Sequence, residues 1–321
     1  MAAQLHVAAD FSELVDLREV TAHELEPVLR EETGAWHDGL AWSFEKSADL
    51  VRRFVGMRAL YGAAIRIRGK AAGYLYYVLE EGKGLIGDLY ILREHRTPAR
   101  EDLLLDTAVE AMINSGAVAR IEAQLMMLDY APSRRIPRAA LGAVFERNFM
   151  RVGVGRGMAK EPEPAGIRME VFSDHDQEAA AQLIAEAYQG HIDGRINDQY
   201  RSVAGARRFL FNIVQYPGCG SFFRPASYTA FDAGGRLCGI SLASLVAPES
   251  GHLTQICVLP DCRGLGIGRA LIRRSLGQLG GLGCRTASLT VTAANRGAVA
   301  LYQRMGFRVV HRFPAYAWEG W

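Results

Sequence analysis

The chain has 321 residues, of which 49% are hydrophobic and 22% are charged, and its formal net charge is +2. This length accommodates two domains, and the composition is typical of a globular protein. Because the basic excess is small, the composition argues against a nucleic-acid-binding protein. The start of the chain, MAAQLHVAADF, has no basic segment followed by a long apolar core, and no apolar run reaches membrane-spanning length. We therefore expect neither a signal peptide nor a membrane partner.

All five cysteines lie in the second half of the sequence: Cys219, Cys238, Cys257, Cys262 and Cys284. None forms a CxxC pair, so we expect no metal site. An odd number of cysteines in a chain of this length predicts free thiols in a reducing compartment. The cysteines therefore predict a cytoplasmic protein.

In the first half, RGKAAGYLYYVL (Arg68–Leu79) predicts a tight turn followed by a strand. The stretch IGDLYILREHRTPAREDLL (Ile86–Leu104) predicts a strand and then a helix, because its apolar residues first cluster and then recur at helical spacing. A further strand is expected at RIEAQL, which begins at Arg120.

The second half repeats these elements. LTQICVLPDCRGLGIGRAL (Leu253–Leu271) aligns with the strand and helix of the first half without a gap, at a constant offset of 271 − 104 = 167 residues. GGRLCGISLASL (Gly234–Leu245) resembles the turn and strand from Arg68, and RTASLT from Arg285 resembles RIEAQL. Such an internal repeat predicts two units of one design.

We place the two predicted domains at residues 1–163 and 164–321, with AKEPEPAG (Ala159–Gly166) as the linker, because it is rich in Pro and Glu. Each half is expected to contain strand, helices, antiparallel strands, the loop and its helix, strand, helix and strand. The sequence therefore predicts an α+β fold with a mixed sheet, present twice.

The end of each half is also expected to match. VFERNFMRV (Val144–Val152) resembles LYQRMGFRV (Leu301–Val309), where the offset falls to 301 − 144 = 157. The first half would then carry a few extra residues, and APSRRIPR (Ala131–Arg138) is the expected insert because its two prolines are typical of a loop.

Three glycines in RGLGIGR (Arg263–Arg269) lie between a predicted strand and a predicted helix. The first N–H groups of a helix have no partner within it, and the helix dipole is positive there. Glycine also lets the backbone approach a phosphate closely. The loop therefore predicts a diphosphate site. It is neither a nucleotide P-loop, which needs Gly-Lys-Ser/Thr, nor a GxGxxG dinucleotide loop, since Arg269 stands at the third glycine position.

Arg-x-x-Gly-x-Gly (Arg263–Gly268), which follows a Val-x-Pro strand end (Val258–Pro260), resembles the pyrophosphate motif of the GNAT N-acetyltransferase superfamily. NRGAVALYQRMGF (Asn295–Phe307) is similar to a second element of that superfamily. The resemblance covers about Gly166–Trp321 and reaches the first half only through the internal repeat. Two such domains in one chain also resemble the plan of mycothiol synthases. The matching positions of the second element are Asn295, Ala298, Leu301, Tyr302, Gly306 and Phe307.

This resemblance implies two tandem GNAT-like domains, each a mixed, largely antiparallel sheet flanked by helices. It also implies direct transfer of an acetyl group from acetyl-CoA to an amine, with Tyr302 as the general acid that protonates the leaving thiolate. The strand before the loop would pair its backbone with the pantetheine arm, as an added strand would. The implied CoA-binding residues are Ile256, Cys257, Val258, Arg263, Gly264, Leu265, Gly266, Ile267, Gly268, Arg269 and Asn295.

The general base stays open at this point. Many members of the superfamily carry Glu six residues before the strand-end Val, and here that position is His252. Histidine can serve as a base near neutral pH, while Glu249 or a chain of waters are alternatives. Neither Cys257 nor Cys262 is expected to be a nucleophile, because no histidine partner is apparent.

Acceptor selection in the superfamily usually comes from the segment after the first strand, here YQGHIDGRINDQYRS (Tyr188–Ser202). Its carboxylates could bind a cationic amine or simply face solvent. The expected partner is a small-molecule or peptide amine that the sequence does not identify. The polar and aromatic candidates are His191, Asp193, Asp198 and Tyr200.

The first half lacks the residues that would bind diphosphate. Thr97, Pro98, Ala99 and Glu101 stand opposite Gly264, Leu265, Gly266 and Gly268. Proline removes a backbone donor, and Glu101 adds an adverse charge. The phenol is also missing, because the alignment places Phe145 opposite Tyr302 and Phe149 opposite Gly306. We therefore expect one working site, in the second half.

Two other functions are compatible with parts of the sequence. A non-catalytic acetyl-CoA-binding sensor or interaction protein would use the glycine loop without chemistry, and the missing Glu at position 252 speaks weakly for it. A tandem relative that uses aminoacyl-tRNA would not need the glycine loop, and the low net charge argues against it.

Overall fold

The computed structural model describes residues 12–155, 163–216, 218 and 220–321. They form two compact units. Unit 1 contains residues 12–36, 44–144 and 316–321, and unit 2 contains residues 37–43 and the described part of 145–315. Residues 156–162, which include the first half of the expected linker, lie outside the described residues, and the expected domain boundary between residues 163 and 164 stays a prediction.

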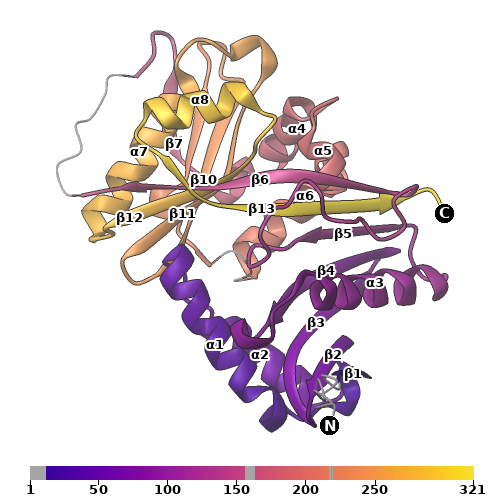
Figure 1. Ribbon diagram of the computed structural model, residues 1–321. Coiled ribbons are helices and arrows are strands. Elements are labelled where there is room, and N and C mark those ends of the chain that lie inside the picture. Colours follow the sequence, from indigo (N-terminus) through magenta and orange to yellow (C-terminus); the bar gives the residue numbers. More distant parts are fainter. Residues whose placement is uncertain (1–11, 156–162, 217, 219) are drawn as a thin grey trace, which may run out of the picture. The chain divides into compact units, whose positions relative to one another are not determined.

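Helices and strands follow in the order shown in Figure 1. Up to the fifth strand they are β1 (Ser12–Asp16), α1 (Ala22–Leu40), α2 (Glu45–Gly56), β2 (Tyr61–Ile67), β3 (Lys70–Glu80), β4 (Lys83–Ile91), α3 (Pro98–Asn114) and β5 (Arg120–Gln124). After it they are β6 (Gly142–Gly153), β7 (Arg168–Val171), α4 (Gln177–Ala187), α5 (Asp193–Ile196), α6 (Val203–Gln215), β8 (Ser221–Phe222), β9 (Tyr228–Phe231), β10 (Leu237–Ala247), β11 (Ser250–Val258), α7 (Ile267–Leu282), β12 (Thr286–Thr292), α8 (Arg296–Arg304) and β13 (Arg308–Glu319).

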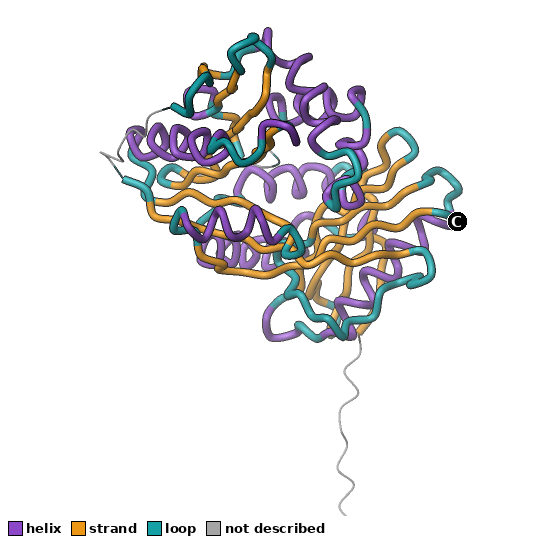
Figure 2. The backbone as a smooth tube through the Cα atoms, turned by 90° about the horizontal axis from the view of Figure 1, so that it is seen from above, coloured by secondary structure: helices purple, strands orange, loops and turns teal. Residues whose placement is uncertain are grey.

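Each unit is a mixed sheet with helices, so the predicted α+β fold is confirmed (Figure 2). In unit 1 the strand order is β1-β2-β3-β4-β5, and the end of β13 follows β5. In unit 2 the order is β6-β12-β11-β10-β9-β7, with β8 beside β10. The β4–β5 and β11–β12 pairs are parallel, whereas the other described registers are antiparallel.

The repeat is present in the strand registers as well as in the sequence. The parallel pairing of β4 with β5 runs from Lys83 to Ile86, and that of β11 with β12 runs from Ser250 to Leu253. Each end of the β4–β5 pairing therefore lies the predicted 167 residues before the corresponding end of the β11–β12 pairing (250 − 83 and 253 − 86). The shift of register in the preceding hairpin also recurs at this offset, at Gly87 in β4 and Thr254 in β11.

One part of the predicted repeat is wrong. Residues 144–152 do not correspond to helix α8, because they lie in strand β6. The counterpart of β6 is β13, which has the same length at an offset of 308 − 142 = 166, so no insert is needed. Between β5 and β6 the described chain contains no helix, and prolines at positions 132 and 137 explain why, since proline lacks the N–H that a helix interior requires.

The last strand of each half of the sequence belongs to the other half's unit. Most of β6 lies in unit 2, where it pairs with β12, and the end of β13 lies in unit 1 beside β5. Trp318 and Tyr316 in β13 are almost completely buried in the core of unit 1, where their rings stack with centroids 5.3 Å apart. The Trp318 indole also donates a hydrogen bond to the carbonyl of Pro137 at 2.6 Å.

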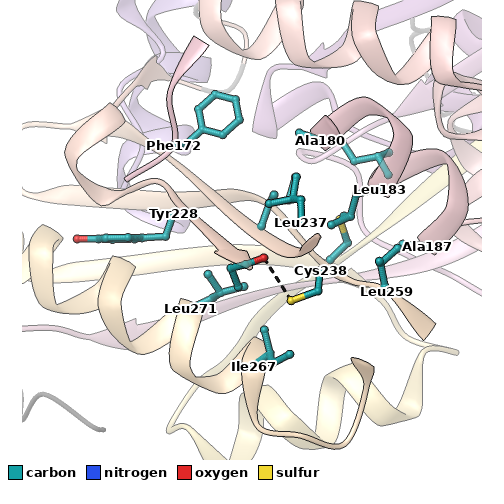
Figure 3. Packing of buried hydrophobic residues seen from close by; sticks show 14 of the residues in the cluster. Phe172, Ala180, Leu183, Ala187, Tyr228, Leu237, Cys238, Leu259, Ile267 and Leu271 are labelled. Carbon is teal, nitrogen blue, oxygen red and sulfur yellow. Dashed lines mark hydrogen bonds between the residues drawn. The ribbon is translucent and has the colours of Figure 1, made fainter. Parts of the chain in front are cut away.

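The core of unit 2 explains how α4 and α7 are fixed on the sheet. Figure 3 shows side chains of both helices gathered around Leu237 and Cys238 of β10, with the Cys238 thiol bonded to the carbonyl of Ala230. Burial raises the pKa of the Cys238 thiol to about 11. All four described cysteines are buried free thiols, while Cys219 lies outside the described residues. Among the described helices, none is both long and apolar enough to span a bilayer.

We expect Trp318→Ala to lower the unfolding free energy of unit 1 by about 3–5 kcal/mol, because the substitution removes a fully buried indole and leaves the Pro137 carbonyl without its donor. Chemical denaturation would measure the loss. Trp321→Ala is the matched control, since that side chain is 39% exposed. Equal stabilities of the two variants would show that the end of the chain does not support unit 1.

Candidate active site

Strands β11 and β12 part in the middle of unit 2. Their parallel pairing ends at Leu253 and Leu289, although β11 continues beside β10 as far as Val258. The edge of β11 that includes Ile256 and Cys257 is therefore not paired with β12. Such an edge can accept the backbone of an extended ligand as an added strand.

The glycine loop lies directly beyond this edge and leads into α7. Gly264 and Gly266 both have φ of 82°, which explains why glycine stands at these two positions. Gly266 is the N-cap of α7, and no side chain caps the first turn. The first turn of α7 therefore presents backbone donors and the positive end of the helix dipole to an anion.

Arg263 fixes this loop to its surroundings. Its guanidinium donates to the carbonyl of Val258 at 3.3 Å and to the carbonyl of Ala187, at the end of α4, at 3.0 Å. Direct contact of Arg263 with a diphosphate stays a prediction, as do the proposed roles of Arg269 and Gly268. The observed bonds show that Arg263 joins the loop to the ends of β11 and α4.

Tyr302, the expected acid, is buried in helix α8 and lies with its ring centroid 6.0 Å from that of Phe307. Burial, together with the charges of Asp193 and Cys257, raises the pKa of Tyr302 well above its usual range, while Arg147 opposes this shift. The phenol is therefore protonated at neutral pH, and its role as the acid stays a prediction. Asn295, an implied CoA residue, is the N-cap of α8, where its side chain accepts from the N–H of Ala298 at 3.2 Å.

The thiol of Cys257 lies in the same region but is not suited to nucleophilic attack. Burial raises the pKa of Cys257 to about 12, and burial also raises the pKa of Cys262 above its ordinary value. The reactive form of cysteine is the thiolate. Both side chains are therefore protonated at neutral pH, which supports the expectation that they are not nucleophiles.

His252, the candidate base, is only 4% exposed. Its ring lies edge-on to Trp42 at 4.8 Å and stacks on Phe149 at 6.2 Å, and its Nδ1 shares a hydrogen bond of 2.9 Å with the hydroxyl of Ser288. Burial, and secondarily Arg147, lowers the pKa of His252 to about 3. A histidine with this pKa is a weak proton acceptor near neutral pH, so the role of His252 as base stays a hypothesis that its surroundings do not favour.

Glu249 precedes β11, at the end of that strand far from the glycine loop, and forms an ion pair with Arg285. Glu249 lies five positions before Thr254, where β11 separates from β12. Five positions correspond to about 16 Å along a strand. This carboxylate is therefore not placed to act at the open edge of β11.

A polar network around the parted strands was not apparent from the sequence. Gln255 of β11 donates its amide to the Tyr188 hydroxyl at 3.1 Å, and the Tyr188 ring stacks on Tyr200 at 4.5 Å. Arg147 of β6 donates to Asp193 at 3.2 Å. Arg147 comes from the first half of the sequence, so only the exchange of last strands reveals that it belongs here.

The corresponding loop of unit 1 is occupied by side chains of the same unit. Glu101 is buried and is bound by Arg96, whose Nε lies 2.6 Å from the carboxylate, and by Arg134. Thr97 caps α3 by accepting from the N–H of Arg100. The cationic and backbone groups that could bind a diphosphate here therefore already have partners within the chain.

Where β4 and β5 separate in unit 1, the side chains differ from those beside β11 in unit 2. Asp88 stands opposite Gln255 in the repeat, and burial raises the pKa of Asp88 to about 6. Burial, and then the charge of Asp88, raises the pKa of Glu32 well above its ordinary value, while the Tyr74 hydroxyl donates to Glu32 at 2.7 Å.

The comparison of Tyr302 with Phe145 was wrong, but the phenol is still missing from unit 1, because the helix that would carry it is absent between β5 and β6.

Residues 195–307 match the acetyltransferase (GNAT) family. Among characterised relatives, a mycothiol acetyltransferase of Streptomyces coelicolor is 38% identical over 27% of this chain and 28% of its own length. Another of that name, from Propionibacterium freudenreichii subsp. shermanii, is 24% identical over 78% of this chain and 80% of its own length. Residues 195–307, in the second half of the chain, are therefore similar to a GNAT acetyltransferase domain.

Solved structures extend the similarity to nearly the whole chain. A GCN5-related N-acetyltransferase from Sphaerobacter thermophilus superposes with a TM-score of 0.66 at 18% identity, over 96% of this chain and 94% of its own. A tandem GNAT protein from the clavulanic acid biosynthesis pathway gives 0.58 at 17% identity, over 96% and 98%. The predicted fold of two tandem GNAT-like domains is therefore confirmed.

The buried His252 predicts an acid-sensitive unit 2. Above the ordinary imidazole pKa of 6.5 both states are neutral, whereas between pH 6.5 and about 3 only the unfolded chain takes up the proton. Through this one group the unfolding free energy should fall by about 1.4 kcal/mol per pH unit as the pH is lowered. Denaturation at several pH values should show a shallower slope for His252→Gln.

His37→Gln is the control, because that histidine belongs to unit 2 and its side chain is 75% exposed. The control should keep the slope of the unsubstituted chain. The same slope in all three proteins would mean that His252 titrates alike in the folded and unfolded chain.

Proposed function

We propose that this tandem GNAT chain is an acyl-CoA-dependent N-acyltransferase, which moves an acetyl group from acetyl-CoA directly to a primary amine. The main support for the proposal is that unit 2 combines three features: the open edge of β11, an α7 N-terminus without a side-chain cap, and a buried phenol. The relatives named mycothiol acetyltransferase support this reaction class. The acceptor is proposed only as an amine.

The residues present fit acetyl-CoA. The first turn of α7 and the two left-handed glycines would hold the diphosphate through backbone donors, since no side chain occupies the cap position. The β11 edge at Ile256–Val258 would hold the pantetheine arm in an extended form. Together these two features would direct the thioester toward the buried phenol of Tyr302.

In the proposed reaction, the chain has to transfer protons near Tyr302. The amine nitrogen forms a bond to the acetyl carbonyl carbon, and the carbon–sulfur bond breaks. Tyr302 supplies the proton that the sulfur takes up and regains one from the amine or from water. Because an ammonium loses two protons during amide formation, one ends on the CoA thiol and the other is released to solvent.

Gly266→Glu tests the proposed binding site. It forces a side chain onto a residue with φ of 82° and adds a negative charge at the N-terminus of α7. We expect the acetyl-CoA affinity, measured by calorimetry, to fall at least about 100-fold. Gly281→Glu is the control, on the same helix but near its other end, where no atom would meet the new Cβ. Unchanged affinity in a folded Gly266→Glu protein would refute the proposed site.

Calorimetric titration of the whole chain should give one acetyl-CoA per chain. Thr97 accepts from the N–H of Arg100, and Glu101 binds Arg96 and Arg134, so a diphosphate at this loop would have to displace a buried carboxylate from these two cations. Gly266→Glu should remove the single binding event. A second event of comparable affinity, which survives that substitution, would show that unit 1 also binds acetyl-CoA.

Tyr302→Phe should lower the catalytic rate by about 100-fold, in the range for loss of a general acid. The affinity for acetyl-CoA should stay within experimental error, because the substitution removes only a hydroxyl. Turnover would be followed by release of free CoA thiol with a panel of amines. Tyr228→Phe provides the control, since Tyr228 is also buried in unit 2. Acetyl-CoA binding without turnover of any amine by the unsubstituted chain would favour a non-catalytic sensor.

A further inference from the structure

Asp193 stands at the start of α5, in the segment expected to select the acceptor. It is not part of a solvated loop, because its side chain is only 14% exposed. One carboxylate oxygen, Oδ1, accepts from Arg147 Nη1 at 3.2 Å and from the hydroxyl of Thr292. Arg147 is held in turn by the hydroxyls of Thr292 at 2.9 Å and Thr290 at 3.1 Å. The carboxylate is therefore fixed in position by one of its two oxygens.

The second oxygen of Asp193, Oδ2, accepts no hydrogen bond from the described residues. The Nδ1 of His191 lies 3.8 Å from Oδ2, beyond hydrogen-bond distance. That nitrogen instead faces the backbone N–H of Asp193 at 3.1 Å. A carboxylate oxygen accepts hydrogen bonds only, so Oδ2 is suited to a ligand that donates them.

Asp193 also lies near the reacting groups. His191, two residues before Asp193, lies with its ring centroid 5.3 Å from that of Tyr188, and its Nε2 is 3.3 Å from the side-chain nitrogen of Asn295, the N-cap of the helix that carries Tyr302. The charge of Asp193 also contributes, after burial, to the raised pKa of both phenols. The Tyr188 hydroxyl in turn accepts from Gln255, on the strand that borders the open edge.

We propose that Asp193 binds the amine of the acceptor through Oδ2, beside the phenol of Tyr302. This inference rests on the proposed transferase function and assigns the acceptor a class, a primary amine that arrives protonated. An acceptor with a carboxylate next to its amine would bring a second negative charge to Asp193. We therefore expect amines without such a carboxylate to be preferred.

Arg147 has a separate role in this arrangement. A primary ammonium has an ordinary pKa near 10.4 and must lose a proton before it attacks. An unpaired carboxylate would stabilise the ammonium and hold it in the unreactive form. Because Arg147 balances the charge of Asp193, the carboxylate can orient the amine while favouring its charge less. Arg147 is thus a positioning residue that acts through Asp193.

The binding test uses Asp193→Asn. Asparagine keeps an oxygen for Arg147 and Thr292 but replaces Oδ2 with an amide that donates. The probes are n-butylamine and n-butanol, which have similar shapes but differ in charge, and the readout is the melting temperature of the whole chain. We expect the unsubstituted chain and the Asp174→Asn control, a surface carboxylate paired with Arg224, to be stabilised more by the amine. Asp193→Asn should lose this difference.

An equal response of the unsubstituted chain to the two probes would overturn the inference, as would an amine preference that persists in Asp193→Asn. These readouts do not depend on turnover. Amine binding that requires Asp193 in a chain that binds no acetyl-CoA would instead contradict the proposed function and leave the Asp193 site standing.

The kinetic test separates the two residues. Asp193→Asn should raise the KM for the amine by about 10–100-fold, as expected for loss of one charge-assisted hydrogen bond, without weakening acetyl-CoA binding. Arg147→Met should move the rising limb of the pH–rate profile to higher pH, because the bound ammonium is then harder to deprotonate. Arg147→Lys should restore the profile. An unshifted profile in Arg147→Met would reject the role of Arg147.

Arg147→Met leaves a buried carboxylate without its partner and so could unfold. The double variant Arg147→Met with Asp193→Asn removes both charges and keeps the region neutral. It should fold, with the pH–rate profile of the unsubstituted chain and the raised KM of Asp193→Asn. A shifted profile in the double variant would show that Arg147 acts independently of Asp193, contrary to the proposal.

Discussion

The candidate site depends on the separation of β11 from β12 after Leu253. While the two strands are paired, their backbone groups are satisfied and no ligand can enter between them. Beyond Leu253 only β10 supports β11, and the register shift at Thr254 marks the point of change. The roles proposed for the glycine loop, the phenol of Tyr302 and the Asp193 carboxylate all require this open strand edge.

The same separation occurs in unit 1 without the same chemistry. The register of β4 and β5 reproduces that of β11 and β12, so the backbone geometry was retained through the repeat. What differs is the side chains, since Asp88 and Glu32 are buried together and Glu101 binds Arg96 and Arg134. The two units therefore share this backbone geometry but differ in the side chains beside it.

The sequence predicted the features that depend on local pattern. Strand, turn and helix signals identified both hairpins and both loop–helix units, and the gapless match over Leu253–Leu271 gave the correct offset. The alignment of Val144–Val152 with Leu301–Val309 was wrong because it compared residue types without their secondary structure. A strand and a helix can contain the same apolar residues. Prolines 132 and 137 were present in the sequence as evidence against a helix there.

Contacts between residues distant in the chain could not be predicted in this way. The burial of His252 depends on Trp42 and Phe149, more than 100 residues away in sequence, and the partner of Asp193 is Arg147 on a strand from the other half. Neither the contacts of His252 nor the Asp193–Arg147 pair produces a periodic pattern in the sequence. An imidazole that could serve as a base in a strand near solvent becomes, in this packing, a neutral core residue.

The exchange of last strands has a consequence for how the chain is made. Unit 1 needs Tyr316 and Trp318 for its core, so β1 to β5 cannot complete that core until β13 has been synthesised. During synthesis β5 has an open edge, while β6 is available long before β12 appears. A ribosome-bound chain in which Tyr316 and Trp318 have not yet been added would thus carry an unfinished unit 1. The two halves, produced as separate polypeptides, would each lack the strand that the other carries.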